Sequence, residues 1–265
     1  MVRFDGRDLT ALSESQPRTR PVTHLQTHHG TVLSYAALRG LMDPGGRQVS
    51  SNAAMTNDGR LIEVVPWRTR RAFTSASAFD HNSFTVECCN QTLGPRWEIS
   101  RAVHERLARL AADMHLDPET RMPLTRAHIV GHKEVPGSYP TVCPGPCMDL
   151  DWVTARSIDI AIGDLMAEAV ELTQAAADAV WSAPKLLRKD GDTPEALLRR
   201  VANTIDEIPA AAKDPNQKPQ SLASRVAGID LNTKDLLKGQ KVTNDTLGQV
   251  VTKLDQIATL LGQRK

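Results

Sequence analysis

The sequence predicts an α/β fold, with a mixed central β-sheet flanked by helices, followed by a small all-helical C-terminal module. Three observations support this. Short apolar runs bounded by turn residues alternate with segments of helical periodicity up to about residue 180. A strong hairpin signal, Asn-Asp-Gly, stands at 57–59 between two apolar runs. Residues 182–265 contain no aromatic, His or Cys residue, so the chain changes character there.

The strands come first. Residues 25–30 form an apolar and polar run that contains His28, and the Asn-Asp-Gly turn joins two strands within 49–62. A further strand is expected over 81–87. Residues 128–132 form a short strand that carries His132 at its end.

The helices follow from periodicity. Residues 100–114 place apolar side chains at helical spacing, and these are Val103, Leu107, Leu110, Ala111 and Met114. A second long helix is expected after Trp152, with Ile158, Ile162, Leu165 and Leu172 along one stripe. It either completes the first domain or leads out of it.

Three residues are candidates for a metal centre. His132 lies at a strand end, and Cys143 lies in a loop stiffened by Pro140, Pro144 and Pro146. Zinc takes imidazole nitrogen and thiolate sulfur, and a catalytic site uses three protein ligands and leaves the fourth position to water. His28, far upstream, would complete such a site. Alone, the His and Cys residues would more often be ordinary core residues.

Four blocks in order resemble the zinc-dependent N-acetylmuramoyl-L-alanine amidases related to peptidoglycan recognition proteins, and most closely the endolysins of actinobacteriophages. The blocks are 25–30, 49–62, 81–87, and Gly131 to Val135 with Cys143 to Trp152. The resemblance covers about residues 20–155. It implies an amidase fold, bacterial peptidoglycan as the partner, and zinc as the cofactor.

The resemblance also implies roles for single residues. His28, His132 and Cys143 are the expected zinc ligands, with His29 as the fallback for His28 and Cys147 as a weaker candidate. Glu87 is the expected general base. The implied reaction is hydrolysis of the amide between N-acetylmuramic acid and L-alanine by zinc-activated water.

Three positions depart from the family pattern. Thr141 stands where a Lys is common, Ser51-Asn52 where a Tyr or His is common, and Phe73-Thr74 where an aromatic-His pair is common. We therefore expect the zinc to carry most of the oxyanion stabilisation. Thr141 remains a candidate catalytic residue.

Other functions are weighed against the amidase. His132-Lys133-Glu134 fits the His-x-Glu of zinc deaminases, but the required Pro-Cys-x-x-Cys does not follow Pro146. The His-Glu-x-x-His of metalloproteases is absent from the sequence. A non-catalytic peptidoglycan-binding protein is the stronger rival, and Cys143 favours the enzyme. A tail-associated wall-degrading protein is an alternative to an endolysin.

Composition limits the function further. The chain has 265 residues, of which 40% are hydrophobic, and a formal net charge of +1. This near-neutral charge does not indicate a nucleic-acid-binding protein. No apolar run is long enough for a membrane span, and the N-terminus lacks the apolar core of a secretory signal. We expect synthesis in the host cytoplasm and release to the wall through a holin. The four Cys residues are expected to be reduced thiols.

The predicted domains are a zinc amidase domain at 1–180 and a helical module at 181–265. The module contains a weak repeat of about 50 residues: the stripe Leu198, Val201, Ile205 and Ile208 recurs as Leu247, Val250, Leu254 and Ile257. Two roles stay open for it, cell-wall binding and self-association through its helices. The lack of aromatic platforms disfavours glycan binding.

Overall fold

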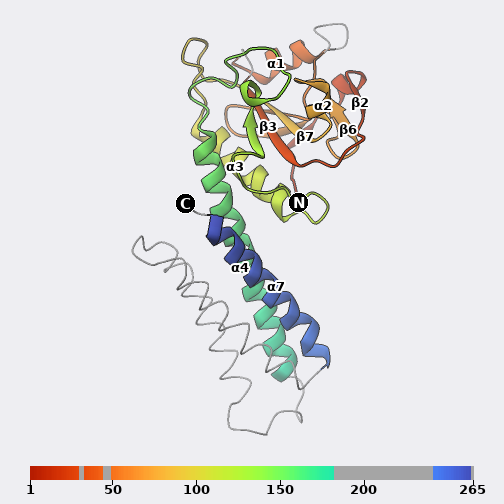
Figure 1. The fold of residues 1–265 in the computed structure, drawn as a ribbon, viewed down its shortest axis with the longest axis vertical. Coiled ribbons are helices and arrows are strands. Elements are labelled where there is room, and N and C mark those ends of the chain that lie inside the picture. Colours follow the sequence, from red (N-terminus) through yellow and green to blue (C-terminus); the bar gives the residue numbers. More distant parts are fainter. Residues whose placement is uncertain (30–32, 44–48, 182–240, 264–265) are drawn as a thin grey trace. The chain divides into compact units, whose positions relative to one another are not determined.

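The structure is a computed structural model that describes residues 1–29, 33–43, 49–181 and 241–263 (Figure 1). The chain divides into two compact units, Met1–Ala161 and Ile162–Lys265. The long helix α4 continues from the first unit into the second.

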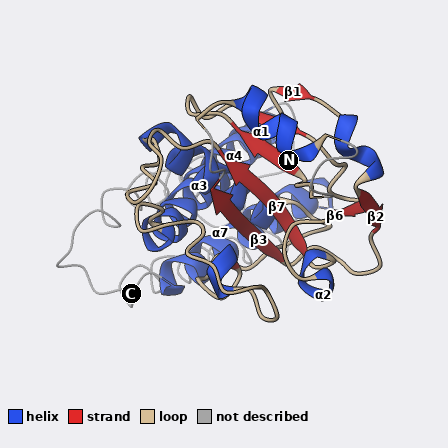
Figure 2. Cartoon of the chain, turned by 90° about the horizontal axis from the view of Figure 1, so that it is seen from above, coloured by secondary structure: helices blue, strands red, loops and turns tan. Residues whose placement is uncertain are grey.

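The first unit is built on a six-stranded mixed sheet in the order β1-β5-β4-β7-β3-β8. All neighbouring pairs are parallel except β4 with β5. Seen from above, β3 and β7 lie side by side in the middle (Figure 2). The strands are β1 (Gly6–Arg7), β3 (His24–His29), β4 (Ala53–Met55), β5 (Leu61–Glu63), β7 (Ser83–Cys88) and β8 (Ile129–Gly131).

A small antiparallel pair and several helices surround this sheet. The pair consists of β2 (Ser15–Pro17) and β6 (Arg70–Ala72). The helices are α1 (Tyr35–Met42), α2 (Ser77–Asp80), α3 (Arg101–Leu116), α4 (Leu150–Trp181) and α7 (Lys241–Gln263), with short 3-10 turns at Thr10–Ser13 and His132–Glu134. The predicted mixed α/β fold is confirmed.

The predicted hairpin joins β4 to β5. Thr56 and Arg60 close the turn through a hydrogen bond from the Thr56 amide to the Arg60 carbonyl (3.0 Å). Gly59 adopts φ +84°, a left-handed conformation that a side chain would strain. The Asn-Asp-Gly signal is therefore confirmed, and its glycine occupies the position that requires one.

The helix expected over 100–114 is α3, and Ser100 caps it. The Ser100 hydroxyl accepts the amide of Val103 (3.1 Å), which satisfies one of the amides that a helix start leaves unpaired. Its predicted apolar stripe is fully buried. The local sequence thus determines both where α3 begins and which face it packs.

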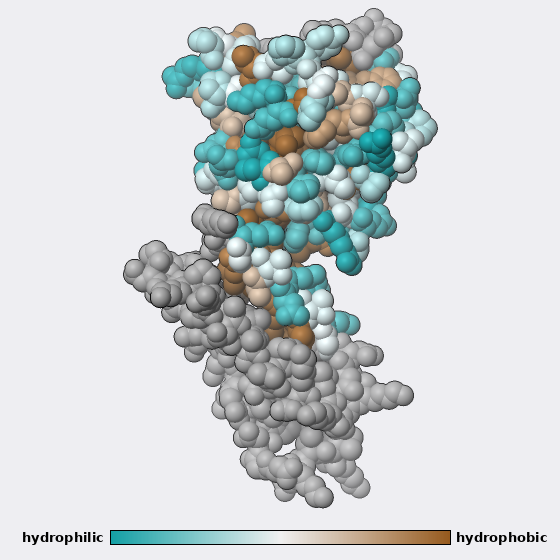
Figure 3. All heavy atoms as spheres, viewed as in Figure 1, coloured by the Kyte–Doolittle hydropathy of each residue, from teal (hydrophilic) through white to brown (hydrophobic). Residues whose placement is uncertain are grey.

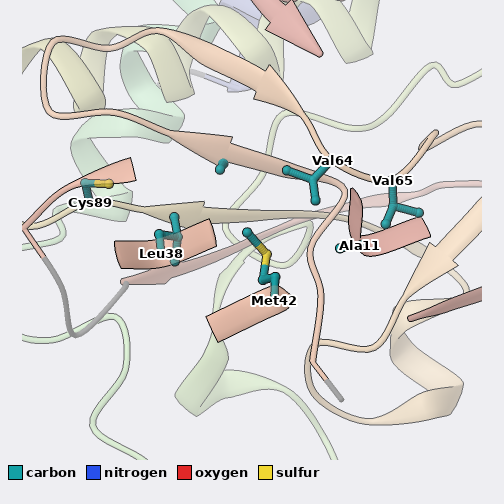
Figure 4. Packing of buried hydrophobic residues seen from close by; sticks show 7 residues of the cluster. Ala11, Leu38, Met42, Val64, Val65 and Cys89 are labelled. Atoms are coloured by element: carbon teal, nitrogen blue, oxygen red, sulfur yellow. The ribbon is translucent and has the colours of Figure 1, made fainter. Parts of the chain in front are cut away.

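Helix α1 is held against the sheet by a buried cluster shown in Figure 4. Leu38 and Met42 of α1 are 2% and 3% exposed and pack with apolar residues of the sheet and of the Thr10–Ser13 turn. The Ser34 hydroxyl caps the helix by accepting the amide of Ala37 (3.3 Å). This packing fixes the position of α1 beside β4.

A guanidinium group ties the first unit together at the start of β7. Arg18 donates hydrogen bonds to the carbonyl groups of Trp67, Asp80, His81, Arg70 and Ser83, and to the side chain of Asn52. Burial lowers the pKa of Arg18 to about 10, so the group stays charged at neutral pH. One side chain therefore joins β6, the α2 segment and β7.

The second unit contains the end of α4 together with α7. Val250, Leu254 and Ile257 of the predicted α7 stripe are buried within the chain, as are Ile162 and Leu165 of α4. Lys253 pairs with Glu168 at 2.8 Å, which places the two helices side by side. The helix predicted for the second copy of the repeat is confirmed, since it lies in α7. The first copy lies outside the described residues.

The surface of the first unit is mostly hydrophilic or intermediate on the face shown in Figure 3. Among the described helices, none is both long and apolar enough to cross a bilayer. No disulfide joins any of the four Cys residues, all of which are among the described residues, and Cys88 and Cys89 are buried.

We expect Arg18→Met to lower the free energy of unfolding by about 3–5 kcal/mol, because it leaves several buried carbonyl groups without a donor. Chemical denaturation followed by circular dichroism measures this. Arg20→Met is the matched control, since Arg20 is exposed, and its effect should stay within about 0.5 kcal/mol. A loss below about 1 kcal/mol for Arg18→Met would contradict the role given to its hydrogen bonds.

Candidate metal centre and active site

The register of the central parallel strands brings two of the expected residues together. His28 of β3 is paired directly with Glu87 of β7. Partners in register project to the same face of a sheet, and Nδ1 of His28 lies 3.7 Å from Oε1 of Glu87. The edge strand β8 pairs with β3 on its other side and ends immediately before His132.

His28, His132 and Cys143 form the group of possible metal ligands found among the described residues. Their ligand atoms lie within 4.8 Å of one another, and the two imidazole centroids are 4.3 Å apart. Zinc bound at 2.0–2.3 Å requires ligand atoms roughly 3.4 Å apart, so the group closes around an ion with shifts of about an ångström. Two imidazoles and one thiol also match zinc by donor chemistry.

Cys143 is positioned by contacts with the segment that carries His132. The Lys133 amide donates to the Cys143 carbonyl (2.8 Å). Pro144 packs so closely on Gly131 that a Cβ there would come within 2.5 Å of the proline ring. These two contacts join the loop to the strand end, which holds the thiol and the imidazole close together.

An ion pair between Glu134 and Arg126 holds the 3-10 turn at His132–Glu134 in place. The Glu134 carboxylate accepts the amide of Gly131 (2.7 Å) and binds Arg126 (2.6 Å). Arg126 also reaches Asp151 at the start of α4 (2.8 Å). Glu134 thus acts as a structural anchor here, which removes the residue that the deaminase alternative needs as its acid and base.

Glu87 has the protonation behaviour of an acid-base group. Burial raises the pKa of Glu87 to about 7. A carboxyl group with such a pKa can accept a proton and return it at neutral pH. A divalent cation held by the three neighbours would lower this pKa, because positive charge favours the carboxylate.

These side chains open into a pocket of about 350 Å³. Its lining residues are His28, Leu38, Leu41, Met42, Val49, Ser50, Thr74, Glu87, Trp97, His132, Thr141, Val142 and Cys143. The five residues expected in the site are all among them. The pocket is apolar on much of its wall and polar where the candidate ligands meet, as small-molecule sites usually are.

The remaining sequence candidates fall in different places. Thr141 lines the pocket, and its hydroxyl accepts the amide of Cys143 (3.1 Å). Ser51 and Asn52 are buried directly before β4, where the Asn52 side-chain amide donates a hydrogen bond to the carbonyl of Val65 (3.2 Å). Cys147 is half-buried and outside the ligand group, and the side chain of His29 lies outside the described residues.

The sequence analysis missed two residues. The carboxamide of Gln26, fully buried on the same face of β3, lies 2.6 Å from Nε2 of His28. Trp97 lines the pocket from the loop after β7. An alternating pattern along 24–29 could have indicated Gln26, since Gln26 and His28 are two positions apart on one strand. No motif marks Trp97.

Comparison with known proteins points to one family. Residues 18–146 match the model of the family described as N-acetylmuramoyl-L-alanine amidase. This match covers slightly less than half of the chain and agrees with the resemblance that the motifs indicate, over most of the stretch that carries them. Among the curated proteins, none matches the chain significantly.

Several solved structures are similar to part of the chain. One is described as the structure of PlyL, with 15% identity over 54% of this chain and 86% of that chain, at a TM-score of 0.40. Another is the solution structure of the PlyG catalytic domain, with 15% identity over 54% of this chain and 84% of that one, also at 0.40.

We expect Cys143→Ala to lose stoichiometric zinc, because two imidazoles alone leave the coordination shell incomplete. Elemental analysis after exhaustive dialysis measures it. Cys143→Asp should retain part of the zinc, since a carboxylate oxygen is also a ligand, and Cys147→Ala should retain all of it. Full zinc in Cys143→Ala would rule out this residue and leave His29 and Cys147 as the remaining candidates.

We expect Gln26→Leu to weaken zinc binding by about 10–100-fold. If His28 binds metal through Nδ1, its proton sits on Nε2 and needs an acceptor. The Gln26 amide nitrogen faces Nε2 in the structure, and a half-turn of the carboxamide would bring its buried oxygen, which has no hydrogen-bond partner there, into the accepting position. Gln26→Glu keeps an acceptor and should keep the affinity. Competition with a chromophoric chelator measures it, and Thr27→Val, on the opposite face of β3, is the control. Equal affinities in all four proteins would show that Gln26 does not orient His28.

Proposed function

We propose that this protein is a zinc-dependent peptidoglycan amidase that hydrolyses the bond between N-acetylmuramic acid and L-alanine. The observation that carries the proposal is the convergence of His28, His132, Cys143 and Glu87 in one pocket. The family match over residues 18–146 supports the substrate class. A sugar-peptide receptor would need neither the ligand group nor an acid-base carboxyl.

Three of these residues are proposed as zinc ligands and the fourth as the general base. His28, His132 and Cys143 would hold the zinc, which when bound supplies Lewis acidity and lowers the pKa of water toward about 7. Glu87 accepts the proton of the attacking water and passes it to the leaving amine of L-alanine. Its position 3.7 Å from His28, one of the proposed zinc ligands, supports this role.

Thr141 is proposed to contact the scissile carbonyl. Its hydroxyl oxygen accepts the Cys143 amide, so its O–H proton remains available to donate. A hydroxyl donor is weaker than the Lys common at this position, because hydrogen bonds from charged donors are stronger. Thr141→Val should therefore lower turnover less than any change at Glu87.

For the biological role we propose host lysis by a phage endolysin released through a holin. The helical module would then bind the wall or join copies of the chain. The described part of the α7 stripe is covered within its own chain, so this stripe is not the surface that would join copies. Sedimentation of the full chain and its decoration of purified walls separate the two roles.

The reaction is tested by digesting purified peptidoglycan and identifying the new ends by mass spectrometry. We expect new free amines on L-alanine and intact glycan strands. Glu87→Gln should keep its zinc and its fold while losing at least about 10²-fold in turnover, as expected when a general base is removed without a change of shape. Turnover within a few-fold of wild type would exclude Glu87 as the base, whereas new reducing sugar ends would exclude the amidase.

A further inference from the structure

The pocket has two chemically different walls on opposite sides of the β3–β7 pair. Helix α1 contacts β4, on one side of that pair, and contributes the aliphatic side chains of Leu38, Leu41 and Met42. The Cys143 loop is bonded to the segment after β8, on the other side. Trp97 packs against this loop and gives the second wall an aromatic surface.

Trp97 is held in a strained conformation. Its φ of 50° lies in the left-handed region, which a bulky side chain avoids. Such a conformation is unfavourable for a residue with a side chain and persists only where the surroundings enforce it. Strained residues of this kind are concentrated at sites that clamp a ligand.

Two glycines leave the space that the indole of Trp97 occupies. A Cβ at Gly94 would come within 2.7 Å of the six-membered ring of Trp97, and a Cβ at Gly145 within 2.9 Å of its Cβ. Both approaches are closer than a side chain permits, so the absence of side chains at both positions lets the indole lie where it does. Gly145 belongs to the same loop as Cys143, which links the indole to the candidate metal centre.

The loop that carries Trp97 is closed by its own contacts. The Gln91 amide donates to the Glu98 carbonyl (2.8 Å), and the Glu98 amide donates to the Thr92 hydroxyl (3.1 Å). Arg96 and Glu98 form an ion pair at 2.7 Å. The indole is therefore presented to the pocket by a loop with internal restraints, which lowers the cost of ordering it on binding.

We infer that Trp97 is the platform for the sugar ring on the muramoyl side of the scissile amide, while the α1 wall receives the stem peptide. This inference rests on the proposed amidase function. The scissile amide has a pyranose ring on one side and the methyl group of alanine on the other. A rigid indole face offers a broad apolar surface for the C–H face of a pyranose, and aliphatic side chains suit a methyl group.

Two substrates separate the sugar from the peptide. A muramoyl peptide carries the ring, and a lactoyl peptide keeps the same amide and stem peptide but lacks the ring. We expect Trp97→Ala to raise KM for the muramoyl peptide about tenfold, with kcat changed less than about threefold, because a binding contact present in both ground and transition state is lost. KM for the lactoyl peptide should stay unchanged, and Trp97→Phe should restore part of the difference.

Matched variants show whether the effect is specific. Leu41→Ala, on the α1 wall, should raise KM for both substrates, since both carry the peptide. Leu93→Ala removes an exposed apolar side chain, 51% exposed, from the same loop outside the pocket lining and should change neither. Zinc content and the denaturation midpoint of each variant show that the centre and the fold are kept.

Equal changes of KM for the two substrates in Trp97→Ala, or no change for either, would overturn the inference. If the wild-type protein cleaves neither substrate, the amidase proposal fails separately. Calorimetric binding of the muramoyl peptide and the lactoyl peptide then tests Trp97 directly. Weaker binding of the muramoyl peptide alone in Trp97→Ala would support the sugar platform, and equal binding by wild type and variant would reject it.

Discussion

The parallel register between β3 and β7 is the constraint on which the site depends. It sets His28 opposite Glu87, and a slip of one residue would turn one of them to the other face of the sheet. Side chains far from the pocket help to define it. Asn52 exchanges hydrogen bonds with Thr85 of β7, and the Arg18 guanidinium binds the Ser83 carbonyl at the start of that strand. Buried polar groups of this kind have few alternative partners, so they specify one pairing.

The second part of the site depends on a loop that is fixed to a strand end. Parallel strands cannot be joined by a tight turn, so β7 and β8 are separated by α3 and long connections. The connection after β7 brings Trp97 to the pocket, and the loop after β8 brings Cys143 to it. Loops on a rigid sheet are where functional residues concentrate, and here Gly131, Pro144 and Gly145 give the loops their close contacts.

The sequence predicts much of this and leaves some of it out, for physical reasons. Hairpin chemistry at Gly59, the Ser100 cap and the α3 stripe are local signals, and each is confirmed. The ligand group was inferred through family motifs, and the structure brings its members together in one pocket. Gln26 and Trp97 escaped notice because their importance arises from tertiary contacts. The division at Ala161 falls inside a continuous helix, where composition gives no boundary signal, and the predicted boundary at 180 stays a prediction.

We propose that this register assembles a zinc centre of two imidazoles and one thiolate. X-ray absorption at the zinc edge of the full-length protein tests it most directly, because sulfur and nitrogen neighbours differ in distance. We expect one sulfur atom at about 2.3 Å from the zinc and nitrogen or oxygen atoms at about 2.0–2.1 Å, and we expect the sulfur to be lost in Cys143→Asp. A shell without sulfur in the wild-type protein, or one with several sulfur atoms, would contradict it.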